Sequence, residues 1–200
     1  GGIVGWWQPG DGSWELTESS FHGTISNKTI AGGLVGVMAV DNVDENTDFL
    51  FSLNSVNATL SNEDLVGGYV GLFGYNSDPQ HTQPNIQITD SYTAVEYGPD
   101  VQIKEPLIYT DFVFDIHNLI WVNSDGNIST ALEDQDGVRS LETVKATFPG
   151  YWVENNFDMT ETWGISSEFN DRLPVLREFN DVTFDIACQV KSFPDIHFTK

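Results

Sequence analysis

Positive charge, cysteine and long apolar runs are all scarce in this chain. Its 200 residues hold 8 Lys and Arg against 30 Asp and Glu, a formal net charge of −22. Phosphate backbones and anionic headgroups are bound by clustered Lys and Arg, so we expect neither nucleic acid nor an anionic membrane surface as a partner. Cys188 stands alone, which excludes an intrachain disulfide. No run of 18 apolar residues offers a transmembrane helix.

Composition says more about the setting of the protein than about its fold. Scarce Lys with abundant Asp is typical of a secreted, marine, salt-adapted or calcium-rich setting, although high charge also serves solubility alone. The length suits one domain, or one repeat array with a cap, and allows a sizeable core. Gly1 lies inside a repeated word and is not a Met, so we expect the sequence to be a piece of a longer chain.

One five-residue word occurs three times in the first 71 residues. Gly32-Gly33-Leu34-Val35-Gly36 is preceded by Gly1-Gly2-Ile3-Val4-Gly5, 31 positions earlier, and followed by Gly67-Gly68-Tyr69-Val70-Gly71, 35 positions later. A word recurring at this interval indicates a repeat architecture. Its glycines allow either a positive φ or close approach of two backbones. Its apolar pair, with Val in every copy, suits a short buried strand.

A second word, containing Ser, follows each copy and alternates between apolar and polar residues. This alternation predicts half-buried strands, and no helical apolar stripe occurs before residue 103. Strands repeating at this interval, with Gly at the corners, favour an all-β fold built as a parallel β-solenoid, in which equivalent residues form ladders. The expected ladders are Val4, Val35 and Val70 inside, Ile3, Leu34 and Tyr69 on the opposite face, and the hydroxyls of Ser20, Ser55 and Ser91 at a turn.

The pattern changes after residue 98, where Pro99 and Pro106 interrupt it. Residues 107–116 predict one long or two short apolar strands, and residues 118–122 predict another. Residues 131–147 hold the only candidate helix, with Ser140 as N-cap and Pro149-Gly150 as its stop; a single helical turn and an irregular loop are equal alternatives. We therefore divide the chain into repeats at 1–98 and a region at 99–200 that continues the solenoid and ends in an irregular, β-rich C-terminal cap.

The two words together resemble the GLUG repeat. That repeat occurs in large bacterial surface and secreted proteins, including adhesin-like chains and some immunoglobulin A peptidases. Residues of about 140–178, with Thr162-Trp163-Gly164-Ile165 and Leu173-Pro174-Val175-Leu176, resemble the segment that closes such arrays. The third repeat departs from the pattern by having Ala94-Val95 where Gly is usual, and residues 180–200 match nothing in it. The resemblance implies an extracellular β-solenoid spacer or adhesin region and carries over no catalytic residue.

Catalytic patterns are missing from the sequence. A polysaccharide hydrolase or lyase needs paired carboxylates, or a carboxylate beside basic groups, on one exposed face. Carboxylates are plentiful, but Lys28 is the only Lys or Arg before residue 104, so an anionic sugar would meet no countercharge. The four His, at positions 22, 81, 117 and 197, are too scattered to indicate a triad or a zinc site. We predict no enzymatic activity and assign no catalytic, cofactor-binding or metal-binding residue.

The densest set of oxygen ligands lies at Asp41–Asp48. Calcium takes six to eight oxygens, so Asp41, Asp44, Glu45 and Asp48 could converge on one Ca²⁺ ion. The loop lacks the Gly and the final bidentate Glu of an EF-hand. A solvated acidic loop is the favoured interpretation.

Three tryptophans bracket a loop of turn residues at 8–12. An exposed Trp beside Asp and Gln can stack on a sugar ring, so carbohydrate binding by Trp6, Trp7 or Trp14 is one interpretation. The favoured alternative is that Trp6 and Trp7 cover the open end of the stack or contact a preceding coil. Trp152 and Trp163, in the closing segment, are expected to fill its core.

Four further residues receive only general interpretations. Asn27, Asn57 and Asn127 lie in sequons, which matter only in a eukaryotic secretory pathway. Cys188 lies in an apolar run and is interpreted as a buried strand thiol.

The sequence therefore predicts a structural protein. We expect an extracellular or cell-surface repeat region of a larger protein, either an adhesin stalk or a filament subunit. Its expected partners are copies of itself or neighbouring domains, together with cell-surface glycans that contact its loops. The alternative is a carbohydrate-binding or polysaccharide-cleaving β-helix module.

Overall fold

The computed structural model describes residues 1–10, 12–26, 29–39, 45–61, 64–74, 84–105, 107–108, 115–123 and 137–178. The chain divides into two compact units, Gly1–Thr143 and Val144–Lys200, which we describe separately.

The first unit consists of short strands. They are β1 (Val4–Trp7), β2 (Ser13–Thr17), β3 (Ser20–Ser26), β4 (Ile30–Gly32), β5 (Val35–Met38), β6 (Asp48–Ser52), β7 (Ser55–Ser61), β8 (Leu65–Gly67), β9 (Val70–Phe73), β10 (Asn85–Tyr97), β11 (Ile103–Glu105), β12 (Asp115–Asn123) and β13 (Val138–Glu142). Every pairing among them is parallel. The prediction of an all-β fold with parallel sheets is confirmed.

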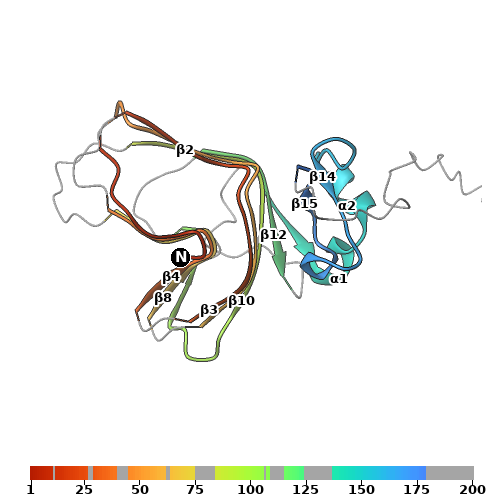
Figure 1. Ribbon diagram of the computed structural model, residues 1–200, viewed down its shortest axis with the longest axis horizontal. Coiled ribbons are helices and arrows are strands. Elements are labelled where there is room, and N and C mark those ends of the chain that lie inside the picture. The colour runs from red at the N-terminus through yellow and green to blue at the C-terminus, as the bar shows by residue number, and fades with distance from the viewer. Residues whose placement is uncertain are drawn as a thin grey trace, which may run out of the picture. The chain divides into compact units, whose positions relative to one another are not determined.

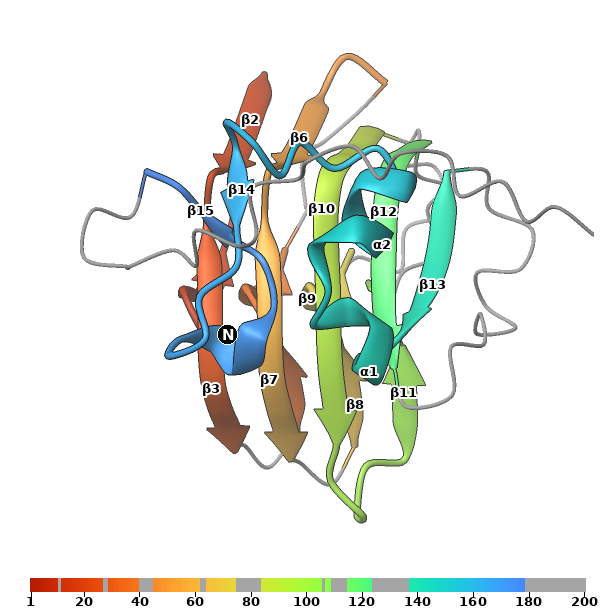
Figure 2. The same cartoon turned by 90° about the vertical axis from the view of Figure 1, so that its right-hand side faces the viewer.

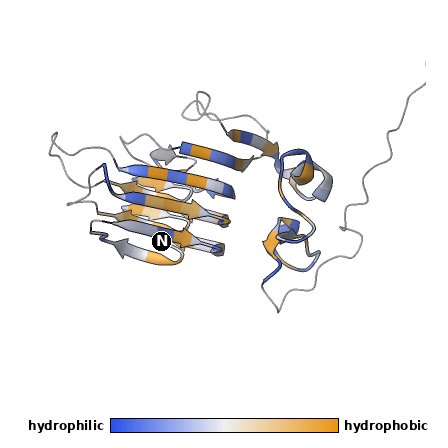
Figure 3. Cartoon of the chain, turned by 90° about the horizontal axis from the view of Figure 1, so that it is seen from above, coloured by the Kyte–Doolittle hydropathy of each residue, from blue (hydrophilic) through white to orange (hydrophobic). Residues whose placement is uncertain are grey.

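Each strand pairs with its counterpart in the next repeat, and three parallel sheets result. The β5 sheet has the order β1-β5-β9, and the β8 sheet has the order β4-β8-β11. The β10 sheet joins β2, β6, β10, β12 and β13 and also holds β3 and β7. Equivalent strands of successive repeats are nearly superimposed in Figure 1 and form parallel layers in Figure 3. Figure 2 shows β3, β7, β10, β12 and β13 side by side.

The expected internal Val ladder is confirmed. Val4 pairs with Val35, and Val35 pairs with Val70, each at the start of a strand of the β5 sheet. Val35 and Val70 are fully buried. Burial of these side chains holds the register, because a slip of one residue would turn each strand's apolar residues to the other face.

A corner in the left-handed region of φ divides the β10 sheet in every repeat. The residues with positive φ are Glu18, Leu53, Asp90 and Asn118, with φ between 45° and 64°. The strand pairs on either side, such as Ser52 with Thr89 and Ser55 with Tyr92, place these residues in one column. Each repeat therefore turns sharply at the same place, so β2 and β6 continue into β3 and β7 on the other side of the corner.

The core of the first unit lies between facing sheets. Phe49 of β6 meets Phe73 of β9 edge to face, with ring centroids 5.1 Å apart, so the β5 sheet packs on the first half of the β10 sheet. Leu60 and Val66, both fully buried, belong to the same apolar cluster on the other side of the corner.

The prediction for the Ile3, Leu34 and Tyr69 ladder is wrong. Leu34 and Tyr69 are fully buried and belong to the core cluster together with the Val ladder. Strand alternation fails here because Gly33-Leu34 and Gly68-Tyr69 form a bend between two strands and do not continue one strand. The Tyr69 hydroxyl lies 2.8 Å from the Asn54 carbonyl oxygen and 3.0 Å from that of Tyr92, across the interior at the opposite corner.

The predicted hydroxyl ladder is correct for two of its three members. Ser20 pairs with Ser55, and the Ser55 hydroxyl donates to the Ser20 hydroxyl at 2.7 Å. Ser91 does not belong to this ladder, because Ser55 pairs with the next residue, Tyr92. The register is set upstream, where buried Ile86 and Ile88 of β10 pair with Phe49 and Phe51 of β6.

Within residues 131–147 the expected single helical turn is present, but its predicted N-cap and its predicted stop are both wrong. Ser140 lies within β13, which pairs with β12 through Trp121, so the stacked strands continue to Glu142. The short helix α1 (Thr143–Ala146) follows, and Pro149 begins helix α2 (Pro149–Glu154) where we expected it to stop one. Proline favours the first turn of a helix, where its missing N–H has no intrahelical partner. The predicted strand at 118–122 is confirmed within β12; residues 109–114 and 131–136 lie outside the described part.

The second unit is small and has an aromatic core. After α1 and α2 come β14 (Trp163–Gly164), the 3₁₀ helix η1 (Asn170–Arg172) and β15 (Val175–Leu176), with β14 and β15 antiparallel. Trp152 and Trp163 are buried and both pack against Phe157, with ring centroids 5.1 and 5.6 Å from its ring. Their expected role in filling this core is confirmed, and the Trp152 indole N–H donates to the Ala146 carbonyl oxygen.

Candidate interaction site on the first repeat

The Trp-bearing loop is where the sequence suggested a ligand, and the structure separates its three tryptophans. Trp6 is 55 % exposed. Trp7 and Trp14 are partly buried and pack against the core cluster, with ring centroids 6.1 Å apart and ring planes nearly perpendicular. The indole N–H of Trp14 donates to the Gly10 carbonyl oxygen at 2.8 Å. Of the three, only Trp6 presents a largely exposed ring to a partner.

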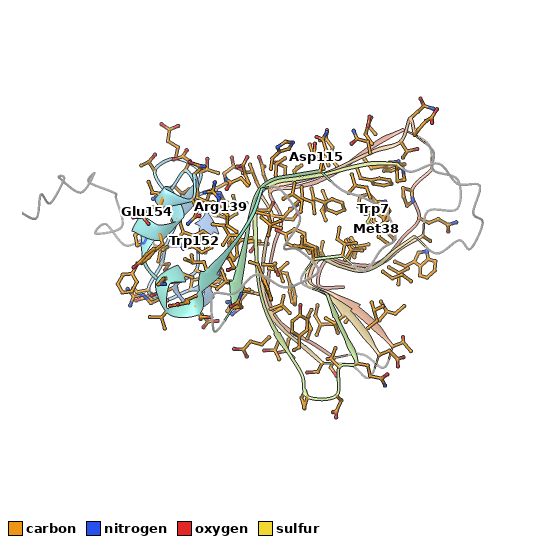
Figure 4. All side chains as sticks on the ribbon, turned by 180° about the vertical axis from the view of Figure 1, so that it is seen from behind. Trp7, Met38, Asp115, Arg139, Trp152 and Glu154 are labelled. Atoms are coloured by element: carbon orange, nitrogen blue, oxygen red, sulfur yellow. The ribbon has the colours of Figure 1, made fainter. Side chains whose placement is uncertain are left out.

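Strand register explains why Trp7 and Trp14 face inward. Trp7 pairs with Met38, which pairs with Phe73, and Trp14 pairs with Phe49. These two tryptophans are thus the first-repeat members of apolar columns that fill the interior of later repeats. Figure 4 shows Trp7 and Met38 next to each other on the inner side of the β5 sheet.

Only two of the four predicted calcium ligands lie in the described part of the chain. Asp41 and Asp44 lie outside it, while Glu45 and Asp48 lie within it. One Asp48 carboxylate oxygen accepts the Asn85 amide at 3.0 Å, and the other lies 3.5 Å from the Ser13 hydroxyl. Among the described residues, no group of three His, Cys, Asp or Glu could hold a metal ion.

Among the remaining residues singled out by sequence, those that the structure describes form no assembled site. His117 and Asp115, both on β12 and largely exposed, form a 3.1 Å pair, and exposed pairs of this kind are weak. Asn57 lies half-buried on β7 between His22 and Ala94 of the neighbouring strands. Asn27, His81, Asn127, Cys188 and His197 lie outside the described residues.

The glycines of the repeated word have a steric role. A Cβ on Gly32 or Gly67 would overlap the carbonyl oxygen of Val35 or Val70, three residues on. A Cβ on Gly36 would lie 2.5 Å from the Gly5 carbonyl oxygen, in the preceding repeat. None of these glycines has positive φ. Close approach of backbones, and not left-handed geometry, is therefore what demands glycine here.

A polar column beside the corner was missed by sequence reasoning. It consists of Ser19, Asn54 and Ser91, the residues that follow the left-handed corner position in three successive repeats. The Ser19 backbone N–H donates to Asn54 Oδ1, and the Asn54 backbone N–H donates to Ser91 Oγ, both at 3.0 Å. The Asn54 and Ser91 side chains thus each satisfy an N–H of the repeat before them. This column is hard to recognise in the sequence because two residue types, Ser and Asn, both accept the backbone N–H.

The first repeat leaves one edge of each of its strands open. Among the described residues, β1 pairs only with β5, β2 only with β6, and β3 only with β7. Ile3 and Trp6 are exposed on this repeat. Unpaired N–H and C=O groups beside exposed apolar side chains can add a further strand, so this edge, formed by β1, β2 and β3, is the candidate interaction site.

No protein-family model, curated protein or solved structure matches this chain. The resemblance to the GLUG repeat stays a prediction. None of the described helices is long and apolar enough to span a bilayer.

Proposed function

We propose that the first unit is a short parallel β-solenoid that serves as a structural spacer in an extracellular or cell-surface protein, as an adhesin stalk or as part of a filament. The observation that carries this proposal is the packing role that the structure gives to the repeated residues. The glycines admit a neighbouring backbone, Val35 and Val70 fill the interior, and Asn54 joins successive repeats by hydrogen bonds. Residues that recur for packing alone are those that a scaffold needs.

In this proposal the stacked strands fix the ends of the variable stretches within each repeat. The stretch between β1 and β2 and the one between β5 and β6 both join the β5 sheet to the β10 sheet. These stretches carry most of what distinguishes one repeat from the next, including the acidic residues at 41–48. A formal charge of −22 keeps such surfaces soluble and limits non-specific association.

Localisation tests the proposal directly. Antibodies raised against the purified chain should label intact cells of the source organism. A protease that does not enter cells should then remove the label. Labelling that occurs only after the cells are opened would contradict an extracellular role.

Carbohydrate binding is the second candidate function, and the exposure of Trp6 is the observation that favours it. A glycan array probed with the wild-type chain, Trp6→Ala and Trp14→Ala tests it. Trp14 is the matched control, because its ring packs on Trp7 and its indole N–H is already bonded. Binding that is lost in Trp6→Ala and kept in Trp14→Ala would establish a carbohydrate-binding module. Measured turnover of a polysaccharide would replace the structural proposal by an enzymatic one.

A further inference from the structure

The first repeat is exposed where the later repeats are buried. Leu34 is fully buried and Val37 is 9 % exposed, whereas their first-repeat counterparts, Ile3 and Trp6, are 46 % and 55 % exposed. A terminal repeat that ended a stack would carry polar residues in these columns, because capping repeats need a polar outer face. The first repeat carries Ile and Trp there instead.

Gly5 gives a second, independent indication. It is the third glycine of its word, equivalent to Gly36 and Gly71. Gly36 excludes a side chain because of the Gly5 carbonyl oxygen, and Gly71 because of the Gly36 carbonyl oxygen, which a Cβ would approach to 2.6 Å. A Cβ on Gly5 would meet nothing within 4 Å. Glycine weakens a strand, and nothing in the structure requires it at this position unless a further backbone lies against it.

The hydroxyl of Ser19 gives a third indication that a further repeat packs on this edge. The Ser91 hydroxyl donates to the Thr89 carbonyl oxygen at 2.6 Å and accepts the backbone N–H of Asn54 from the preceding repeat. The Ser19 hydroxyl donates in the same way to the Thr17 carbonyl oxygen, at 2.9 Å. No donor among the described residues uses its acceptor side. Ser19 is thus set, like Ser91, to receive an N–H from a repeat before it.

We propose that the first repeat is an interior repeat, and that a further coil of the same type packs in parallel on its β1, β2 and β3 edge, with Gly5 admitting its backbone and the Ser19 hydroxyl accepting its corner N–H. This inference rests on the proposed scaffold function and names the partner of that scaffold. The coil is one covalently continuous with the first repeat. Neighbouring strands in all three sheets come from consecutive repeats of one chain, and two copies carrying −22 each would repel.

An extended chain tests the inference. In this variant a second copy of residues 1–31 is placed ahead of Gly1. Its Ala31 is then followed by Gly1, as Ala31 is followed by the equivalent residue Gly32 in the original chain, so the repeat spacing is kept. The extended chain should melt at a higher temperature than the 200-residue chain. In hydrogen exchange, the amide of the duplicate's own Ser19 should be protected, because it donates to Ser19 of the original first repeat.

Two substitutions in the original first repeat then separate stacking from mere extension. Gly5→Ala should leave the melting temperature of the 200-residue chain unchanged within error and should lower that of the extended chain by about 3 °C or more. Ser19→Ala should remove the new amide protection in the extended chain. Gly36→Ala is the matched control, because its Cβ is obstructed in both chains and it should destabilise both.

The inference is overturned if Gly5→Ala is tolerated equally in both chains, or if the duplicate remains protease-sensitive with no added amide protection. Sedimentation of the 200-residue chain supplies a further check. A dimer that Gly5→Ala disrupts would show that a second copy occupies the edge, and would overturn the covalent assignment. None of these failures touches the scaffold function of the 200-residue chain, which is tested by localisation and polysaccharide turnover.

Discussion

The backbone N–H of Ser19 donates a 3.0 Å hydrogen bond to the side-chain Oδ1 of Asn54, one repeat further along the chain. The amide nitrogen of the same side chain donates to the Leu16 carbonyl oxygen at 2.7 Å. Asn54 is fully buried. One fully buried side chain therefore satisfies two backbone groups of the preceding repeat, both at half-buried residues.

Replacing Asn54 by Ala should destabilise the first unit strongly. The substitution leaves the Ser19 N–H and the Leu16 carbonyl, both at half-buried residues, without this partner, and an unsatisfied backbone group costs up to about 1–3 kcal/mol where it is buried. Denaturant unfolding measures the loss. Asn85→Ala is the control, since Asn85 is exposed and its amide donates to Asp48; it should change stability by less than about 0.5 kcal/mol. Equal losses in the two variants would show that the Asn54 bonds carry no special weight.

Gly67→Ala should prevent the third copy of the word from folding as it does. The added Cβ would overlap the Val70 carbonyl oxygen, which belongs to the backbone and cannot move aside as a side chain would. We expect a loss of about 3 kcal/mol or more in the free energy of unfolding. Gly10→Ala is the matched variant, because a Cβ there meets open space. Retention of wild-type stability in Gly67→Ala would refute the steric role of the word's glycines.

Burial raises the pKa of the Tyr69 hydroxyl far above its ordinary value. An unfolded tyrosine ionises near pH about 10, so stability is full below that pH and falls as the pH rises above it. Ultraviolet titration should show that Tyr69 ionises only as the first unit unfolds. Tyr69→Phe should remove that step and lower stability by about 1 kcal/mol, from lost hydrogen bonding to Asn54 and Tyr92. Tyr151→Phe, at an exposed position, is the control for stability.

The second unit offers a test at acid pH. Hydrogen bonds from the Thr160 hydroxyl, and then from the Glu161 backbone N–H, lower the pKa of Asp158 to about 2. The stability this gives is present above about pH 4, the usual aspartate pKa, and is lost as the pH falls toward 2. This contribution to the free energy of unfolding is small because Asp158 is exposed.

Thr160→Val should raise the pKa of Asp158 toward 4, as measured by NMR titration of its carboxyl group. Thr147→Val, which removes a hydroxyl bonded only to the Val144 carbonyl oxygen, should leave that titration unchanged. If the pKa of Asp158 stays near 2 in Thr160→Val, the Thr160 hydroxyl is not the main cause of the low pKa.

Local spacing was enough to predict the parts of the fold that depend on side-chain type. Val recurs in each word because a β-branched residue suits a buried strand, so the Val4, Val35 and Val70 ladder could be predicted. The parallel sheets followed from the same interval. Leu34 and Tyr69 were misplaced because a bend interrupts the alternation on which the prediction depended.

The corner and the open edge depend on backbone geometry, which different residue types can satisfy. The left-handed positions are held by Glu18, Leu53, Asp90 and Asn118, none of them glycine. These residues share no sequence signal, and only their pairing brings them into one column. The meaning of Gly5 was likewise hidden, since it becomes visible only against Gly36, where the same residue meets a neighbouring carbonyl.

The spacing of the paired strands also has a consequence for how the chain folds. Parallel partners in the first unit are separated by 19 residues, as from Leu119 to Val138, up to 38 residues, as from Leu65 to Ile103. The entropy of closing a loop rises only by about 0.6 kcal/mol for each doubling of its length. None of the described strand pairings has to bring distant ends of the chain together. Each repeat can therefore fold onto the one before it as it emerges from the ribosome, and a chain with more repeats need not fold more slowly at any single step.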